Sequence, residues 1–203
     1  MIALIAIAAV AGLSAFTAVG VKDQTYVASP EFSANAEASS ENVVVYYSRS
    51  GHSEAVAREV AKRLKAPISR IDADYPLSFG GQTKAIADAE AKAFPLINVE
   101  SLDLRPAKRV YLVSPTWMFR PAPPLWTFVR QSDLSGKDVV LIMTGNSRFK
   151  QEEIDKFSHL INSRGGHLIH QEFIRRGRVY WQMSRGELLD TVNSSMNELA
   201  PQH

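Results

Sequence analysis

The sequence predicts an α/β fold: a doubly wound, five-stranded parallel sheet with helices on both faces. Apolar runs alternate with helical patterns five times along the chain. Several of these runs are apolar on both faces, as in residues 138–144, and strands buried on both sides are typical of a parallel sheet covered by helices. In such sheets a ligand lies outside the carboxyl ends of the strands. Three loops are expected to meet there: residues 48–53, 115–120 and 145–149.

The strands follow from short runs of β-branched, aromatic and aliphatic residues. The first is Val43–Tyr47, and Ile68–Ile71 is a shorter run that begins after Pro67. The first has the composition of a buried strand, and the second is a short candidate strand. The remaining strands are expected over residues 109–114, 138–144 and 167–174.

The helices follow from apolar residues spaced three to four apart. After His52, such a pattern runs through Ala55, Val56, Val60 and Leu64, so a helix is expected to begin near His52. Alanines and charges favour a second helix over residues 83–94, which Pro95 should end. Further helices are expected around residues 125–129, over residues 154–161 before a glycine pair, and over residues 184–199.

The composition of the 203-residue chain excludes several classes of function. There is no cysteine, so disulfides, thiolate metal sites and cysteine nucleophiles are absent. The formal net charge of +2 is too small to indicate nucleic acid as a partner. His159, His167 and His170 lack metal-ligand spacing, so we expect no metal site. No G-x-S-x-G motif is present, which argues against a serine hydrolase.

The N-terminal segment has the length of a membrane span. Residues 1–21 contain no charged side chain, and as a helix they would reach about 31 Å at roughly 1.5 Å per residue. We expect an uncleaved membrane anchor, while Ala34-Asn35-Ala36 leaves a cleaved export signal open. Lys22 alone does not determine the side of the membrane. Residues 22–41 are small and polar and predict a flexible linker, which leaves residues 42–200 as the folded domain.

The first of the three loops has the composition of a phosphate site. It offers the hydroxyls of Ser48, Ser50 and Ser53, and Gly51 allows close approach to the backbone. A strand that leads through such a loop into a helix directs backbone N–H groups and a helix dipole at one point. The loop lacks both G-x-x-x-x-G-K-[ST] and G-x-G-x-x-G, so a nucleoside triphosphate or a dinucleotide is not favoured. The alternative is that the serines only cap the helix.

Two further stretches bear on a ligand. Trp117 and Phe119 lie beside prolines in the second loop, where a planar ring could bind or where the aromatic residues could simply pack into the core. Arg175, Arg176 and Arg178 follow the last strand. They could attract phosphates, an acidic partner or anionic lipid, or they could form a solvated basic loop.

These motifs together resemble the flavodoxin family. The segment YYSRSGHS before a helix is similar to the family's FMN-phosphate loop, and SPTW, PAPP and FVRQSDLSGKDVVLIMTG are similar to the stretches around the flavin ring. The resemblance covers residues 42–195. It implies that the FMN phosphate is held by Ser48, Arg49, Ser50, Gly51, His52 and Ser53, that the ring and ribityl chain are bordered by Pro115, Thr116, Trp117, Met118 and Phe119, and that the ring's other edge is approached by Thr144, Gly145, Asn146 and Ser147.

The resemblance also implies a function. FMN would carry the redox chemistry with NADH or NADPH as donor and a quinone-type acceptor, or would relay electrons to a small-molecule or protein partner, with no catalytic side chain. Flavodoxin-fold reductases are often dimers, so a homodimer is a further implied partner. A cation such as Arg120 or Arg148 near the ring would favour the reduced flavin.

The chain departs from the family pattern in two loops and in its charge. His52 replaces a frequent asparagine, Met118-Phe119-Arg120 replaces an aromatic and a glycine, and the domain is mildly basic where electron-transfer flavodoxins are acidic. Two interpretations therefore stand. One is a flavoprotein oxidoreductase or electron carrier, tethered to a membrane or exported, and the other is an interaction module of the same fold that has weakened or lost flavin chemistry.

Overall fold

The computed structural model of the chain describes residues 14, 41–100, 102–177 and 181–199. The helix predicted for residues 1–21 and the linker predicted for residues 22–41 fall outside this part, except for Ser14 and Glu41. Among the described residues, no helix combines the length and the apolar character needed to cross a bilayer.

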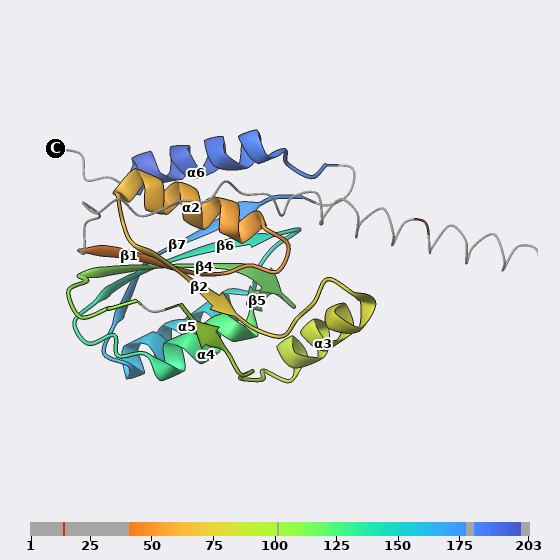
Figure 1. The fold of residues 1–203 in the computed structure, drawn as a ribbon, viewed down its shortest axis with the longest axis horizontal. Helices are drawn as coiled ribbons and strands as arrows, with labels where there is room; N and C mark the ends of the chain where they lie inside the picture. The colour runs from red at the N-terminus through yellow and green to blue at the C-terminus, as the bar shows by residue number, and fades with distance from the viewer. Residues whose placement is uncertain (1–13, 15–40, 101, 178–180, 200–203) are drawn as a thin grey trace, which may run out of the picture.

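A mostly parallel sheet forms the centre of the domain (Figure 1). Its five parallel strands stand in the order β2-β1-β4-β6-β7, and all five were expected from the sequence: β1 (Asn42–Tyr47), β2 (Ile68–Asp72), β4 (Arg109–Trp117), β6 (Asp138–Gly145) and β7 (His167–Arg175). Two antiparallel strands extend the sheet to seven: β3 (Asn98–Val99) pairs with β2, and β5 (Arg120–Pro121) pairs with β4. Each has only two residues, too few to give an alternating pattern, so the prediction of five strands was too low.

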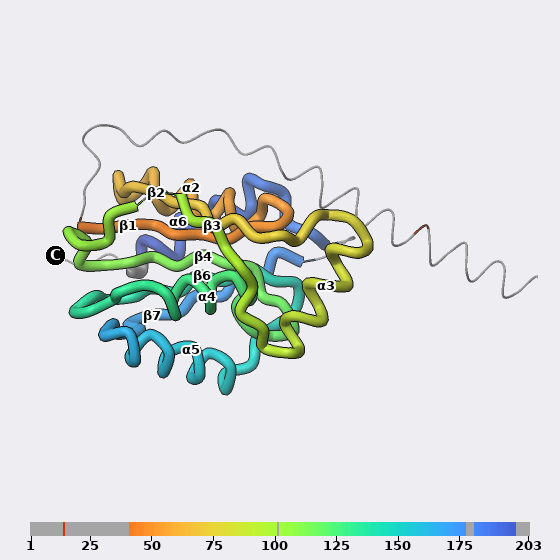
Figure 2. The backbone as a smooth tube through the Cα atoms, turned by 60° about the horizontal axis from the view of Figure 1, so that its bottom comes forward, coloured from red at the N-terminus to blue at the C-terminus, as the bar shows by residue number. Residues whose placement is uncertain are grey.

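Helices cover both faces of the sheet, as Figures 1 and 2 show. One face carries α2 (His52–Leu64) and α6 (Arg185–Leu199), which pack on each other. The other face carries α4 (Pro123–Gln131) and α5 (Gln151–Ser163). The remaining helix, α3 (Phe79–Glu90), lies beyond the carboxyl end of β2, at the edge of the sheet where the predicted ligand loops begin.

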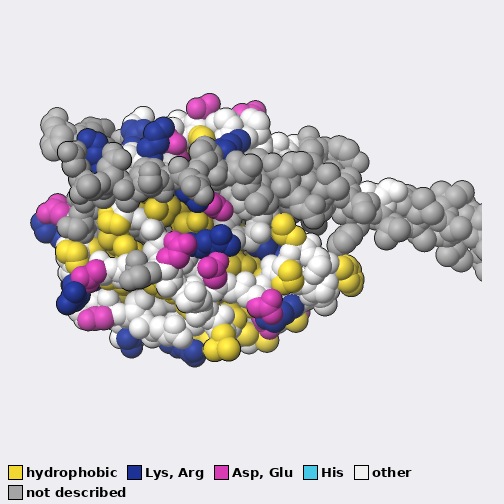
Figure 3. All heavy atoms as spheres, in the orientation of Figure 1, with side chains coloured by type: hydrophobic (Ala, Val, Ile, Leu, Met, Phe, Trp, Pro, Cys, Tyr) yellow, Lys and Arg dark blue, Asp and Glu magenta, His cyan; other side chains and the backbone are white. Residues whose placement is uncertain are grey.

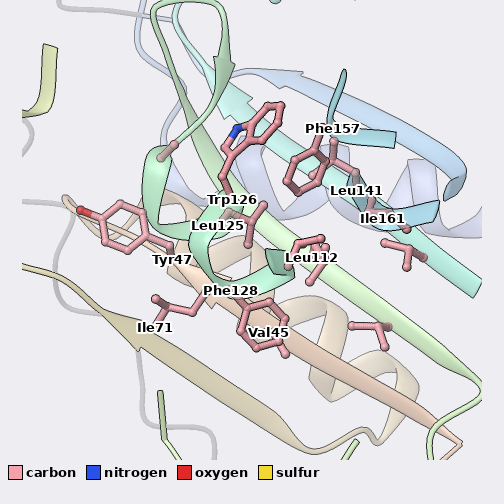
Figure 4. Close-up of a cluster of buried hydrophobic side chains, with 14 of the residues drawn as sticks. Val45, Tyr47, Ile71, Leu112, Leu125, Trp126, Phe128, Leu141, Phe157 and Ile161 are labelled. Atoms are coloured by element: carbon pink, nitrogen blue, oxygen red, sulfur yellow. The ribbon is translucent and has the colours of Figure 1, made fainter. Parts of the chain in front are cut away.

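The core is divided by the sheet into two layers because successive strand residues point to opposite faces. Val45 and Tyr47 of β1 belong to the layer under α4 and α5, together with Leu125 and Phe157 (Figure 4). Val44 belongs to the layer under α2 and α6. Each fully buried side chain of this size contributes about 1.5–3 kcal/mol. This rigid frame fixes the positions of the strand ends.

Helix α3 and strand β4 have bounds that differ from the sequence prediction. The second helix begins at Phe79 rather than residue 83 because the Ser78 hydroxyl caps it by accepting from the Gly81 N–H at 3.2 Å. It ends at Glu90, so Pro95 does not terminate it. Strand β4 continues through Pro115 to Trp117, where a loop was expected, because residues 116–117 pair with residues 120–121 in a tight hairpin.

The proline-rich loop is therefore shorter than predicted. Pro123 and Pro124 occupy the first turn of α4, where a missing backbone N–H costs no helical hydrogen bond. Between β4 and β5 the irregular stretch is the two-residue turn of the hairpin, Met118 and Phe119.

Candidate functional site

A cavity of about 410 Å³ opens where the three predicted loops meet, at the carboxyl ends of the parallel strands. Twelve of the fifteen predicted site residues line it: Ser48, Arg49, Ser50, His52, Ser53, Pro115, Thr116, Trp117, Met118, Thr144, Gly145 and Asn146. Gly51, Phe119 and Ser147 are not among the lining residues. Six lining residues were not in the predicted set: Leu77, Ser78, Gln82, Ala85, Ile86 and Arg176. That these residues bind a flavin stays a prediction.

The first loop forms the β1–α2 end of the cavity. Gly51 occupies the position before α2 in the left-handed region at φ 92°, and its backbone N–H donates to Ser48 Oγ at 3.1 Å. Because a Cβ is costly in that region, glycine has a local conformational role here, behind the cavity wall. No side chain caps α2. The predicted alternative, that the serines only cap the helix, is therefore wrong.

Hydroxyl groups join the first loop to the third. Ser53 Oγ and Thr144 Oγ1 lie 2.8 Å apart and both residues are buried. Gly145 follows Thr144, and a Cβ added there would lie 2.2 Å from Thr116 Oγ1 and 2.8 Å from the Phe173 ring. The absence of a side chain at Gly145 thus lets the second and third loops approach each other.

His52 is a buried residue with a titratable side chain at this end of the cavity. Its Nδ1 lies 3.1 Å from Ser50 Oγ, and its Nε2 lies 2.6 Å from Gln182 Nε2 and 3.5 Å from Arg176 Nη1. Burial, and after it the charge of Arg176, lower the pKa of His52 to about 3. The imidazole is therefore neutral at physiological pH.

Arg175 and Arg176, two members of the predicted arginine group, have different surroundings in the structure. Arg176 lines the cavity, whereas Arg175 is exposed and stacks its guanidinium over the Trp181 ring at 5.7 Å. Arg178 lies outside the described residues. The sequence did signal this cluster, since it follows the last strand, but did not identify which arginine faces the ligand.

Arg49 lines the cavity, and its guanidinium also holds the segment that leads into α3. Its guanidinium donates to the carbonyls of Tyr75 at 3.2 Å and Pro76 at 2.7 Å, and also to Gln82 Oε1. These bonds hold the β2–α3 segment and α3 against the first loop. The observed role of Arg49 is to hold α3, and its contact with a phosphate stays a prediction.

The other end of the cavity is apolar and aromatic. Trp117 is packed edge-on against Tyr47 at 5.5 Å and Tyr75 at 5.0 Å, so its ring is held rigidly. Helix α3 supplies Ile86, which is 40% exposed, and Phe79 stands nearby on the same helix at 70% exposure. Figure 3 shows apolar side chains on the surface at the α3 end of the molecule. This mouth can receive a flat apolar group.

The Met118-Phe119 turn is backbone-strained. Met118 and Phe119 have φ angles of 48° and 67°, which non-glycine residues rarely adopt. Two successive left-handed residues form the turn type that joins tightly paired strands and usually contains Asn-Gly. Met118 lines the cavity, while the Phe119 ring lies beside the cations of Arg148 and Lys150, each at 5.4 Å.

Neither arginine expected near a flavin ring lines the cavity. Arg120 is 5% exposed, pairs with Glu153 at 3.1 Å and stacks over Trp126 at 4.1 Å. The short hairpin turns its side chain into the core beside α5. Arg148 is exposed and reaches the Phe119 ring instead. Neither side chain lines the cavity, and an electrostatic effect of Arg120 or Arg148 on a flavin ring stays a prediction.

The charges of the lining residues have one sign. Arg49 and Arg176 carry positive charge, and no Asp or Glu is among the residues that line the cavity. Asn146 Oδ1 is buried and accepts no hydrogen bond from the described part of the chain. The cavity thus combines a positive, hydroxyl-rich end, an apolar end and an amide oxygen that lacks a donor, which suits an anionic ligand with a ring that bears an N–H.

The chain resembles known proteins at the level of its fold. No protein-family model matches the chain, and no curated protein matches it. A flavoprotein from Lactobacillus acidophilus NCFM, solved in complex with FMN, aligns with a TM-score of 0.57 and 17% identity, over 66% of this chain and 92% of that one. Two proteins assigned as flavoproteins, from Bacteroides eggerthii DSM 20697 and Bacteroides uniformis ATCC 8492, align with TM-scores of 0.61 and 0.58. Their identities are 14% and 16%, over 80% and 75% of this chain and 99% and 97% of theirs.

These likenesses show the fold. The chain is a doubly wound α/β protein, and its fold is flavodoxin-like, as the sequence predicted.

Proposed function

We propose that the chain binds FMN in this cavity and serves in electron transfer or in NAD(P)H-dependent reduction of a quinone-type acceptor. The observation that carries the proposal is the two-ended cavity at the carboxyl edge of the sheet. One end joins the uncapped start of α2 to serine hydroxyls and Arg176, and the other is bounded by Trp117, Met118 and Ile86. Its volume of about 410 Å³ is in the range of cofactor sites.

The residues present fit FMN on three counts. A helix start and hydroxyls beside two arginines, without a carboxylate, favour a phosphate. The buried Asn146 Oδ1, which lacks a donor, could accept from a ring N–H. The wall at Trp117 and Met118 is apolar enough for a flavin ring. Bound FMN would supply hydride and one-electron chemistry through its ring, and the protein would bind, orient and shield it.

The redox partner would approach at the α3 end. Ile86 and Met118 line the cavity there and are also 40% and 41% exposed, so an apolar quinone or a partner protein could contact the mouth. The chain would be held at a membrane or exported through residues 1–21. Membrane fractionation of cells that express the full chain, compared with a form that begins at residue 37, tests the anchor.

A visible spectrum tests the FMN proposal directly. The full chain, purified in mild detergent, should be yellow or should take up one FMN, and Ser50→Asp should lose flavin because its carboxylate repels the phosphate. Ser50→Ala removes one hydroxyl without adding charge and should weaken FMN binding several-fold without abolishing it. A colourless protein that takes up no added FMN would contradict the proposal. If flavin binds, oxidation of NADH or NADPH with a quinone separates an enzyme from a carrier.

The second candidate is an interaction module of the same fold without redox function. The strained Met118-Phe119 turn favours it, because this turn reshapes the ring end relative to the family's aromatic-glycine pattern. In that case the same titration would show no flavin uptake.

A further inference from the structure

The segment after β7 is anchored at the phosphate end of the cavity. The Arg176 N–H donates to the Gly145 carbonyl at 2.9 Å, and the Arg176 carbonyl accepts from the Met183 N–H at 2.7 Å. These two bonds fix the backbone of Arg176 beside the third loop, and its side chain lines the cavity. The placement of this cation is therefore set by the sheet edge and not by a free loop.

The contacts of His52 determine which ring nitrogen carries its proton. Arg176 Nη1, 3.5 Å from His52 Nε2, can only donate, so Nε2 acts as the acceptor. The Gln182 amide nitrogen lies 2.6 Å from the same atom and can also only donate, so it and Arg176 compete for the single lone pair of Nε2. The proton of the neutral ring is then on Nδ1, which lies 3.1 Å from Ser50 Oγ and donates to it.

This arrangement orients the Ser50 hydroxyl. Because Ser50 Oγ accepts from His52, its own hydrogen is available to donate in another direction, and Ser50 lines the cavity. Arg49, the other cation of the wall, directs its guanidinium to the carbonyls of Tyr75 and Pro76. Arg176 is thus the cation whose side chain reaches the same group of residues as Ser50.

We propose that Arg176 is the charge partner of a phosphate monoester dianion bound at the start of α2, and that neutral His52 is a positioning residue that directs the Ser50 hydroxyl to the same phosphate. The inference rests on the proposed FMN function and deepens it. It assigns the preference for FMN over uncharged riboflavin to a cation that lies 124 residues from the phosphate loop in sequence. The ring end, which both flavins share, would contribute equally to each.

The test measures the affinity of the full chain for FMN and for riboflavin by quenching of flavin fluorescence. Arg176→Gln is expected to weaken FMN binding about 30-fold, the usual size of a charge-assisted hydrogen bond, and to leave riboflavin binding within twofold. Arg176→Lys should restore part of the loss. Arg148→Gln removes the same charge from an exposed site outside the cavity and should alter neither affinity by more than twofold.

Two variants test the role of His52. Asparagine can place an N–H near the position of Nδ1, so His52→Asn should keep the FMN-to-riboflavin affinity ratio within about twofold of wild type. His52→Leu lacks any donor and should lower the ratio about fivefold. Riboflavin binding reports in each case that the cavity is intact. Inorganic phosphate should compete with FMN in the wild type and less effectively in Arg176→Gln.

The outcomes separate the two proposals. If the wild type binds neither flavin, the proposed function fails. If it binds FMN and riboflavin equally, or if Arg176→Gln weakens both flavins alike or neither, FMN binding stands and the Arg176 assignment is overturned. If His52→Leu keeps the wild-type ratio, the positioning role of His52 is overturned.

Discussion

Lowering the pH should destabilise the fold through His52. In the folded state burial and the Arg176 charge lower the pKa of His52 to about 3, whereas in the unfolded chain it returns to its ordinary value of 6.5. The unfolded state therefore binds the proton first, and stability is lost as the pH falls from about 6.5 towards about 3. At pH 5, about 1.5 pH units below the ordinary value, the loss is about 2 kcal/mol at roughly 1.36 kcal/mol per unit.

The assay is urea unfolding of the flavin-free fragment 37–203 between pH 7.5 and pH 5. Other groups also titrate in this range, so the informative quantity is the difference between wild type and His52→Asn, which cannot take up a proton. His159→Asn removes an imidazole from the exposed face of α5, away from the cavity, and controls for the loss of a histidine. Equal pH slopes for wild type and His52→Asn would refute the reasoning, because a buried neutral imidazole must resist protonation.

Three further predictions concern stability and the ring end of the cavity, each measured by urea unfolding at pH 7.5. Gly80→Ala should stabilise by about 0.5–1 kcal/mol because a Cβ meets no atom within 4 Å, whereas the adjacent Gly81→Ala should destabilise by about 1–3 kcal/mol because its Cβ would lie 1.9 Å from the Pro76 carbonyl oxygen. Equal effects would contradict this. Met118→Asn should stabilise by about 1 kcal/mol, since asparagine tolerates φ of 48°, and should weaken flavin binding because an apolar wall residue is lost. A less stable variant would refute the strain argument. Glu153→Gln should destabilise by about 3 kcal/mol because it leaves a buried arginine without its counter-charge, and a cost below 1 kcal/mol would show that the pair is dispensable.

The Arg120–Glu153 ion pair is a second contribution to stability that is lost at acidic pH. Burial acts to raise the pKa of Glu153, but the hydrogen bond from Lys156 and the charges of Arg120 and Lys92 outweigh it and hold the pKa below the ordinary 4.5. Because this pKa is lowered in the folded state, its stabilisation is present above about pH 4.5 and is lost below it. The His52 effect begins near pH 6.5, so between about pH 6.5 and pH 4.5 it acts without the Glu153 contribution, and below pH 4.5 both act together.

The sequence predicted the parallel strands and the three loops because these depend on local composition and on one topological rule. Residues 139–143 are apolar on both faces, which is typical of a covered parallel strand. The helix expected from His52 to Leu64 has those bounds in the structure. The carboxyl-edge rule then brought together loops that are far apart in the chain. For these elements the local sequence pattern agrees with the topology of the sheet, so both the strands and the loop positions could be predicted from the sequence.

The wall formed by α3 was missed for a physical reason. Gly80 and Gly81 are poor helix formers, so the sequence favoured a loop there, yet the Ser78 cap and the bonds from Arg49 hold the first turn of the helix. Capping by Ser78 is local and could have been found. The contribution of Arg49 is a long-range contact that no local pattern contains.

The orientation of the Arg120 side chain also depends on a contact that the local sequence does not reveal. Its position after Trp117 suggested a cation near the ring, but the two-residue hairpin reverses the chain and turns Arg120 towards Trp126 and Glu153. Only the turn type decides this, and Met118-Phe119 does not look like the Asn-Gly pair that such a turn usually contains. Because Met118-Phe119 is an unusual sequence for this turn, the direction of the Arg120 side chain could not be predicted from the sequence.

The division of the phosphate end between distant segments also bears on how a ligand would act on the fold. The serines and the α2 start come from the chain around β1, but Arg176 arrives only when β7 is paired with β6 and its backbone is bonded to Gly145. Two strands, β4 and β6, separate β1 from β7 in the sheet. A phosphate that contacts both ends of this arrangement would bind the complete sheet in preference to partly opened forms, and would stabilise it by mass action. A site confined to the first loop would give no such preference, so under the proposed assignment of Arg176 ligand binding would depend on the whole domain.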